Sequence, residues 1–130
     1  MSAHTRAESA PYVCIAERNP RIRAFLLKEF HRAGYRVLAA SNDRELAASA
    51  DAEPRPDVFV VDLNMPGLEQ GLSGRSAALV RPVVAYALLP DNEGHPLLAA
   101  ASAVVEKGAD PRELLAVVER LLPGAAPGGE

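Results

Sequence analysis

The segment Val58–Gly67, with the sequence VFVVDLNMPG, decides the fold that we predict for this chain. Its first four residues are all apolar, which is typical of a β-strand that is buried on both faces. Asp62 follows this run, and a Met-Pro-Gly turn comes shortly after the aspartate. Because a strand buried on both faces needs a layer of helices on each side, the segment predicts an α/β protein with a parallel sheet.

Four other short apolar runs have the same character, and helix-compatible sequence separates them. We expect five strands, at Tyr12–Ala16, Tyr35–Ala39, Asp57–Asp62, Val83–Leu88 and Ala103–Glu106. Three helices have clear starting signals, which are Asn19-Pro20, Ser41-Asn42-Asp43 and Asp110-Pro111. A weaker helix is expected around Ser76–Val80, and a helix that is apolar nearly all round is expected over Pro96–Ala103. Five βα units of this kind predict a parallel sheet covered on both faces.

Composition and charge exclude several classes of function. The chain has 130 residues, of which 48% are hydrophobic, and a net charge of −3 without a long basic run, so we expect no nucleic acid partner. Its apolar stretches are shorter than the roughly 18 residues of a membrane span, and no export signal is recognisable, so we expect a cytoplasmic protein without membrane contact. The single cysteine, Cys14, is expected to be buried packing. We expect one domain at 11–122, between disordered tails at 1–10 and 123–130.

The ends of the predicted strands carry the candidate functional residues. In doubly wound parallel sheets, ligands bind in a crevice outside the carboxyl ends of the strands. The residues at these ends are Glu17, Arg18, Asp62, Ala87 and Lys107. We assign no role to the three histidines.

Three parts of the sequence together resemble the receiver domain of two-component response regulators: residues 13–23, residues 60–67 and Lys107. The most specific part is a strand followed by Asp-x-x-Met-Pro-Gly, and the resemblance covers about residues 11–122. It implies a flavodoxin-like (βα)5 fold, in which a doubly wound five-stranded parallel sheet has the strand order 2-1-3-4-5. It also implies that Asp62 is in the phosphoacceptor position. Since no output domain follows the last predicted helix, we expect a stand-alone receiver.

The resemblance also implies how such a site works. A carboxylate at a strand end can attack phosphorus and form an acyl phosphate when its charge and that of the phosphoryl oxygens are screened. In the family, two acidic residues after strand one, the phosphoacceptor and a main-chain carbonyl two residues later hold Mg²⁺, and a lysine from strand five completes the screen. The matching positions here are Glu17, Asp62, the backbone carbonyl of Asn64, and Lys107.

Arg18 departs from the family pattern, because the family has an acid that touches the metal directly at this position. The family pocket carries a formal charge of about −2, whereas Glu17 and Asp62 here face Arg18 and Lys107, for a sum of about zero. We therefore predict that the Arg18 guanidinium takes the place of the metal beside Asp62, and that Mg²⁺ binds weakly or not at all. The alternative is that Glu17 and Arg18 form no more than a surface ion pair.

The positions that report phosphorylation in the family are also changed. The Ser or Thr that binds the phosphoryl group falls on Ala87, which has no hydroxyl. Val104 stands where the family often has a switching Tyr or Phe, and Gly108 replaces the proline that typically follows the lysine. The sequence thus predicts an atypical, degenerate receiver, whose sheet and partner surface remain while phosphorylation at Asp62 is impaired.

Such a protein would act through protein partners. The apolar segment before strand five, together with strand five and the last helix, forms the face 95–122, which is expected to mediate homodimerisation or docking of a protein partner. A histidine kinase or phosphotransfer protein is also a candidate partner. A close variant of this hypothesis is a phosphorylation-competent single-domain response regulator that accepts a phosphoryl group from a histidine kinase.

Two functions of other classes are disfavoured. A small phosphohydrolase with Asp62 as its nucleophile would need a second carboxylate two residues later, where this chain has Asn64. A flavodoxin-like cofactor binder would need a phosphate-binding loop after strand one, but Glu17–Pro20 contains no glycine. We therefore expect a signalling module and not an enzyme.

Overall fold

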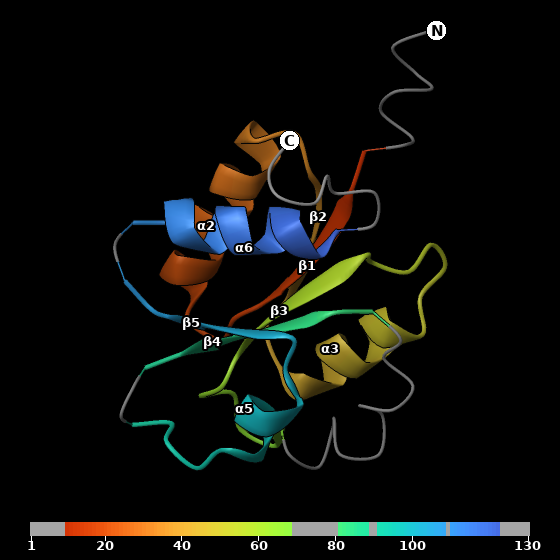
Figure 1. Cartoon of the computed structure of the whole chain (residues 1–130). Coiled ribbons are helices and arrows are strands. Elements are labelled where there is room, and N and C mark those ends of the chain that lie inside the picture. Colours follow the sequence, from red (N-terminus) through yellow and green to blue (C-terminus); the bar gives the residue numbers. More distant parts are fainter. Residues whose placement is uncertain (1–9, 69–80, 89–90, 109, 123–130) are drawn as a thin grey trace, which may run out of the picture.

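Five parallel strands form a single sheet in the computed structural model, which describes residues 10–68, 81–88, 91–108 and 110–122. The sheet order is β2-β1-β3-β4-β5 (Figure 1). The strands are β1 Tyr12–Ala16, β2 Arg36–Ala40, β3 Val58–Asp62, β4 Val83–Ala87 and β5 Ala103–Glu106. This confirms the predicted fold class and strand order, and the observed strands differ from the predicted ones by at most one residue at either end.

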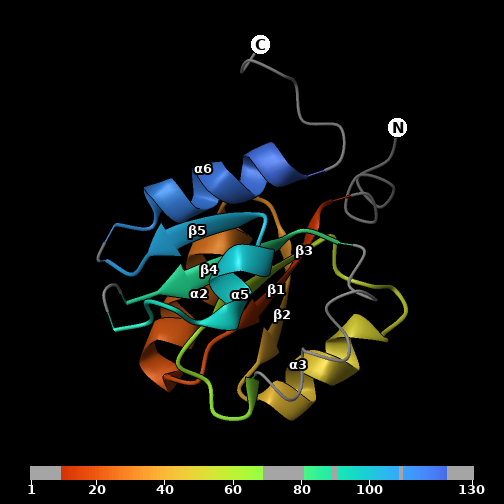
Figure 2. The same cartoon turned by 60° about the horizontal axis from the view of Figure 1, so that its bottom comes forward.

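Helices cover both faces of the sheet, as Figures 1 and 2 show. One face carries α2 Pro20–Arg32 and α6 Arg112–Leu121, while α3 Asp43–Ala50 and α5 Pro96–Ala100 lie on the other. The two buried apolar clusters follow this division, since Phe30 of α2 belongs to one and Leu46 of α3 to the other. The domain is therefore doubly wound.

The positions of the first four residues of β3 explain why all four are apolar. Val58 and Val60 belong to the core under α2 and α6, whereas Phe59 and Val61 belong to the core under α3 and α5. All four are at most 1% exposed. Because successive side chains of a strand point to opposite faces, a strand between two helical layers must be apolar at every position. Asp62, also fully buried, ends this run.

Polar side chains accept hydrogen bonds from backbone N–H groups at the starts of three helices, where the sequence predicts these starts. The Asn19 side chain accepts hydrogen bonds from the backbone N–H groups of Arg21 and Ile22, and the Asn42 side chain accepts one from Glu45. Asp110 accepts one from the backbone N–H of Arg112, at 2.9 Å. These bonds satisfy N–H groups that have no partner within their own helix.

The α5 helix is shorter than predicted. It ends at Ala100, and Ala101 already has the extended backbone angles φ −74° and ψ 151°. The cause lies in the sheet, because Ala103 pairs with Val84 and the Ser102 N–H donates to the Val83 carbonyl at 2.8 Å. Strand pairing therefore overrides the helical preference of the alanine run.

Two predicted features lie outside the described residues. They are the helix around Ser76–Val80 and, apart from Ala10, the two terminal tails. Within the described ranges, no helix is long and apolar enough to cross a membrane. Cys14 is fully buried and unpaired, in agreement with its predicted packing role, and burial raises the pKa of its thiol to about 11.

Candidate functional site

The strand registers bring the predicted site residues to one edge of the sheet. Asp62 at the end of β3 pairs with Tyr86 of β4. The Glu17 N–H extends the β1–β2 ladder by donating to the Ala40 carbonyl, and the Lys107 N–H extends the β4–β5 ladder by donating to the Ala87 carbonyl at 2.7 Å. The backbone therefore fixes the Cα positions of both residues relative to Asp62.

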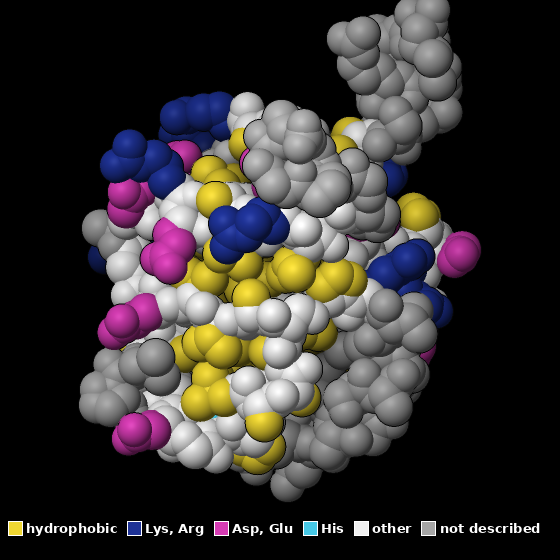
Figure 3. Space-filling view, in the orientation of Figure 1, with side chains coloured by type: hydrophobic (Ala, Val, Ile, Leu, Met, Phe, Trp, Pro, Cys, Tyr) yellow, Lys and Arg dark blue, Asp and Glu magenta, His cyan; other side chains and the backbone are white. Residues whose placement is uncertain are grey.

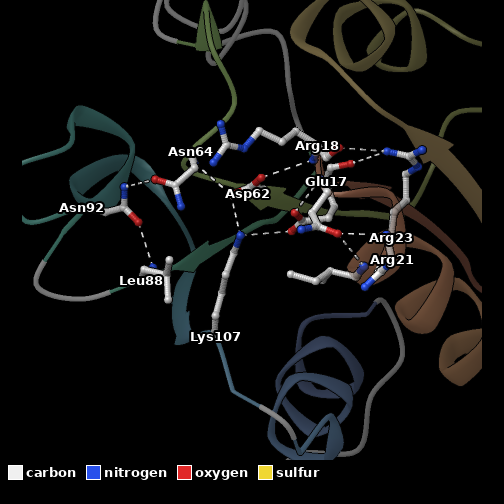
Figure 4. A network of polar contacts seen from close by, with 11 residues as sticks. Glu17, Arg18, Arg21, Arg23, Asp62, Asn64, Leu88, Asn92 and Lys107 are labelled. Carbon is white, nitrogen blue, oxygen red and sulfur yellow. Dashed lines mark hydrogen bonds and ion pairs between the residues drawn. The ribbon is translucent and has the colours of Figure 1, made fainter.

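The Lys107 ammonium group joins the two buried carboxylates. Its Nζ lies 2.8 Å from Asp62 Oδ1 and 3.2 Å from Glu17 Oε1. Figure 4 draws both contacts as dashed lines. Asp62 is fully buried, and Glu17 is 1% exposed. The Glu17 contact has the distance of an ion pair but not the direction of a hydrogen bond. The sequence analysis therefore selected three residues that meet in one cluster, which we call the Asp62 cluster: Glu17, Asp62 and Lys107.

Backbone N–H groups bind the remaining carboxylate positions. Asp62 Oδ1 also accepts from the Asn64 N–H at 2.9 Å, and Asp62 Oδ2 accepts from the Arg18 N–H at 3.3 Å. Glu17 Oε2 accepts from the Asn19 N–H at 3.0 Å. Each of the four carboxylate oxygens thus has a nitrogen within 3.3 Å.

The two carboxylates differ in acidity. Burial disfavours the ionised form of Asp62, but the hydrogen bonds from Lys107 and from the Asn64 N–H outweigh it and hold its pKa below the ordinary value. For Glu17 burial is the larger effect, and together with the charge of Asp62 it raises the pKa against the opposing contacts of Asn19 and Lys107. Asp62 is therefore the more acidic of the two carboxylates, and an ionised carboxylate is the form that can act as a nucleophile.

Arg18 reaches Asp62 through its backbone and not through its guanidinium group. Figure 4 shows its side chain extended toward Asn64. Within the described ranges no ion pair joins the guanidinium to Asp62, which differs from our prediction that it would take the place of the metal. The physical reason is that Lys107 already occupies the buried side of Asp62, and an exposed guanidinium keeps its hydration.

Ala87 is fully buried at the end of β4 and belongs to the core under α3 and α5. Its methyl group offers no hydrogen bond toward Asp62. Val104, at the position where the family often has an aromatic residue, is 42% exposed, and Gly108 is exposed at the edge of the site.

Sequence reasoning missed three residues that support the site. Asn92 is 8% exposed, and its amide donates to Asn64 Oδ1 at 2.9 Å and accepts from the Leu88 N–H at 2.8 Å. The Arg23 guanidinium donates to the Glu17 carbonyl at 2.9 Å, and the Tyr86 ring lies 5.5 Å from Lys107 Nζ. The Asp-Asn pair at 91–92 signals a turn, but no pattern in the sequence indicates that its asparagine is buried.

A cleft of about 540 Å³ opens outward from this cluster. Its walls come from the start of α2 and from the ends of β3, β4 and β5, and its floor includes Glu17 and Lys107. Among the described residues, no group of three or more His, Cys, Asp or Glu side chains is placed to hold a metal ion.

The sheet order and this edge define a class: a doubly wound α/β domain with an ionised aspartate and a lysine at the carboxyl ends of β3 and β5. No family model matches the sequence. Protein Rrf1 of Nitratidesulfovibrio vulgaris is 32% identical over 120 residues, which cover 89% of this chain and 86% of that protein.

Two solved structures share the fold. Response regulator TrrA of Thermotoga maritima, determined in complex with Mg²⁺-BeF, superimposes with a TM-score of 0.76 and 22% identity over 86% of this chain and 99% of its own. Chemotaxis response regulator CheY4 of Vibrio cholerae gives a TM-score of 0.73 and 24% identity over 88% of this chain and 100% of its own. The chain belongs to the response regulator receiver family.

Proposed function

We propose that this chain is a receiver that signals through protein contacts and accepts a phosphoryl group at Asp62 poorly. The observation that carries the proposal is the charge balance of the Asp62 cluster. Two buried carboxylates share one ammonium group, and the adjacent position, where the family has a second acid, is Arg18.

The residues present do not suit a divalent ion. In a receiver, Mg²⁺ screens the attacking carboxylate and the phosphoryl oxygens. Here Glu17, Asp62 and Lys107 sum to a formal charge of about −1 instead of the −2 of the family pocket, the exposed Arg18 adds a positive charge nearby, and the carboxylate oxygens already face nitrogen donors. Mg²⁺ prefers several oxygen ligands in an octahedral arrangement, so two carboxylates and the Asn64 carbonyl are a small donor set beside two cations.

The residues that would surround a phosphoryl group on Asp62 support the same proposal. A phosphoryl group on Asp62 would need hydrogen-bond donors for its oxygens, and Lys107 is one such donor. Ala87 supplies none, because its side chain is a buried methyl group. Ala87 would therefore not stabilise a phosphoryl group on Asp62, whereas the Ser or Thr at this position in the family does.

A phosphorylation-competent receiver is the second candidate. The low pKa of Asp62 and its 2.8 Å contact with Lys107 favour it, since both keep the carboxylate ionised and place a cation beside it. In that case a histidine kinase or phosphotransfer protein would be the donor.

The face 95–122 is proposed as the contact surface for a protein partner or a second copy. Figure 3 shows hydrophobic side chains gathered over the region where Figure 1 draws α5, β5 and α6. Val104 is 42% exposed on β5, which is an edge strand. Leu98 on α5, the element before β5 in the chain, and Leu115 on α6, the element after it, are half-buried. Apolar surface of this kind on a receiver favours association.

Intact mass spectrometry after incubation with acetyl phosphate and Mg²⁺ tests the proposal. We expect little or no gain of a phosphoryl group by the wild type and a clear gain by Arg18→Asp, which restores an acid at the metal position. Arg32→Asp is the matched control, because Arg32 is 66% exposed at the far end of α2 and the same charge change there should have no effect. A stable phosphoryl gain by the wild type that disappears in Asp62→Ala would support the second candidate instead.

A further inference from the structure

The cleft above the Asp62 cluster has an apolar wall that the proposed function does not use. Among the described residues, three large hydrophobic side chains are exposed, each by 42%: Phe25, Leu88 and Val104. Two of them, Phe25 and Leu88, line this one cleft together with Ile22. Since isolated exposed apolar residues are common but clustered ones mark binding sites, the cleft is the place in the described structure where ligand contact would bury them.

Two cations that line the same cleft have no anionic partner among the described residues. Arg18 and Arg21 both line it, and within the part of the chain that the structure describes neither guanidinium group forms an ion pair. Lys107 differs, because Asp62 and Glu17 already neutralise it. The charge available to a ligand is therefore that of the two arginines.

An apolar wall beside two guanidinium groups that no described carboxylate pairs with favours one kind of ligand. A guanidinium binds a carboxylate, sulfonate or phosphate group through two parallel hydrogen bonds, and an apolar body gains free energy when it leaves water against Phe25 and Leu88. A simple inorganic anion would leave the apolar wall exposed, and a neutral apolar molecule would leave the arginines unpaired. The cleft volume of about 540 Å³ also lies in the range of small-molecule sites.

We propose that this cleft binds a small organic anion without forming a covalent bond. The charged group of the ligand pairs with a guanidinium group at the rim of the cleft, that of Arg18 or that of Arg21, and its apolar body lies against Ile22, Phe25 and Leu88. This site goes beyond the proposed function and needs no phosphorylation. Because Glu17 and Lys107 of the Asp62 cluster line the cleft, a bound ligand would lie beside that cluster.

Fluorescence titration with 1-anilinonaphthalene-8-sulfonate, an aromatic anion, tests this site in the full chain. We expect saturable binding of one probe molecule per chain. The double variant Arg18→Ala, Arg21→Ala should weaken binding by about tenfold or more, because it removes both guanidinium groups that are available to the sulfonate. Phe25→Ala should weaken it by roughly fivefold through lost apolar contact.

Matched controls separate this site from general apolar surface. Val104→Ala removes a side chain outside the cleft that is as exposed as Phe25. Arg32→Ala removes a cation from the far end of α2, the helix that carries Arg21. Both substitutions should leave the affinity unchanged. The uncharged probe N-phenyl-1-naphthylamine should not distinguish the wild type from the double arginine variant. Each variant is first shown to unfold at the wild-type temperature, and Leu88→Ala replaces Phe25→Ala if the latter is unstable.

Three results would overturn the proposal: non-saturable binding, equal weakening by Val104→Ala and Phe25→Ala, or full affinity in the double arginine variant. None of them depends on phosphorylation at Asp62, so the site and the proposed function fail separately.

Discussion

Two ion pairs of this domain have the same length and opposite surroundings. Lys107 Nζ lies 2.8 Å from Asp62 Oδ1, and Arg112 Nη2 lies 2.8 Å from Asp110 Oδ2. The first pair is buried, with side chains 10% and 0% exposed, whereas the second is 86% and 56% exposed at the start of α6. Distance alone therefore does not tell what an ion pair contributes, because burial decides how costly it is to leave one partner alone.

The two pairs also serve different purposes. Asp110 accepts the Arg112 N–H at the start of α6, and its hydrogen bonds with Arg112 lower its pKa to about 2. Water surrounds this pair and can replace either partner. Asp62 has no such replacement, since its oxygens are bound by Lys107, Asn64 and the Arg18 backbone in the interior.

The largest expected effect follows from removing the shared cation. Lys107→Met leaves Glu17 and Asp62 as two buried carboxylates without a counter-charge, and we expect a loss of about 3–5 kcal/mol in the free energy of unfolding. Urea denaturation at neutral pH measures it. Arg112→Met is the matched control at the exposed pair, and its unfolding free energy should match the wild type. Equal effects of the two substitutions would contradict this account of burial.

A smaller effect is expected for the buried amide beside the cluster. Asn92→Ala removes the hydrogen bonds to Asn64 and to the Leu88 N–H, and we expect a loss of about 1–3 kcal/mol. Hydrogen exchange should also become faster at the Leu88 amide, which then lacks its acceptor. Asn42→Ala, which removes an exposed helix cap, serves as a comparison, because it should leave exchange at Leu88 unchanged. Unchanged exchange in Asn92→Ala would show that the Asn92 amide does not hold the Leu88 backbone in place.

The smallest effect concerns pH, and the two carboxylates act in opposite directions. The lowered pKa of Asp62 gives stability that is present above its unfolded pKa and lost as the pH falls through the folded value. Glu17 has a raised pKa, so the native state takes up its proton before the unfolded chain does, and this uptake favours the fold as the pH falls.

Glu17→Gln should therefore change the pH profile of stability. Between about pH 7 and pH 4, the variant should lose more of its unfolding free energy than the wild type does, because it lacks the favourable proton uptake. Urea denaturation across this range is the measurement. Parallel profiles for the two proteins would mean that Glu17 has an ordinary pKa in the folded state.

The sequence predicted the sheet well because each strand carries its own signal. The run from Val58 to Val61 must be apolar on both faces, and the strands Tyr12–Ala16 and Ala103–Glu106 appear with their predicted bounds. The α5 helix was predicted too long, because the end of an alanine run depends on the pairing of Ala103 with Val84. That pairing is a long-range contact, and local helical propensity contains no information about it.

The site was predicted in its members but not in all of its contacts. Residues at the carboxyl ends of parallel strands must meet, so Glu17, Asp62 and Lys107 could be grouped from their positions. The sequence could not predict which cation enters the interior, because this depends on the direction in which each side chain leaves the backbone. Lys107 approaches from β5 with a long flexible stem, while Arg18 presents its N–H to Asp62 and its guanidinium to solvent.

Calorimetric titration of Mg²⁺ into the wild type and into Arg18→Asp tests the central claim most directly. The claim is that the Asp62 cluster carries too little negative charge to hold a divalent ion. We expect no measurable heat of binding at millimolar Mg²⁺ for the wild type, and saturable binding for the variant. Saturable binding by the wild type, abolished in Asp62→Ala, would contradict the claim.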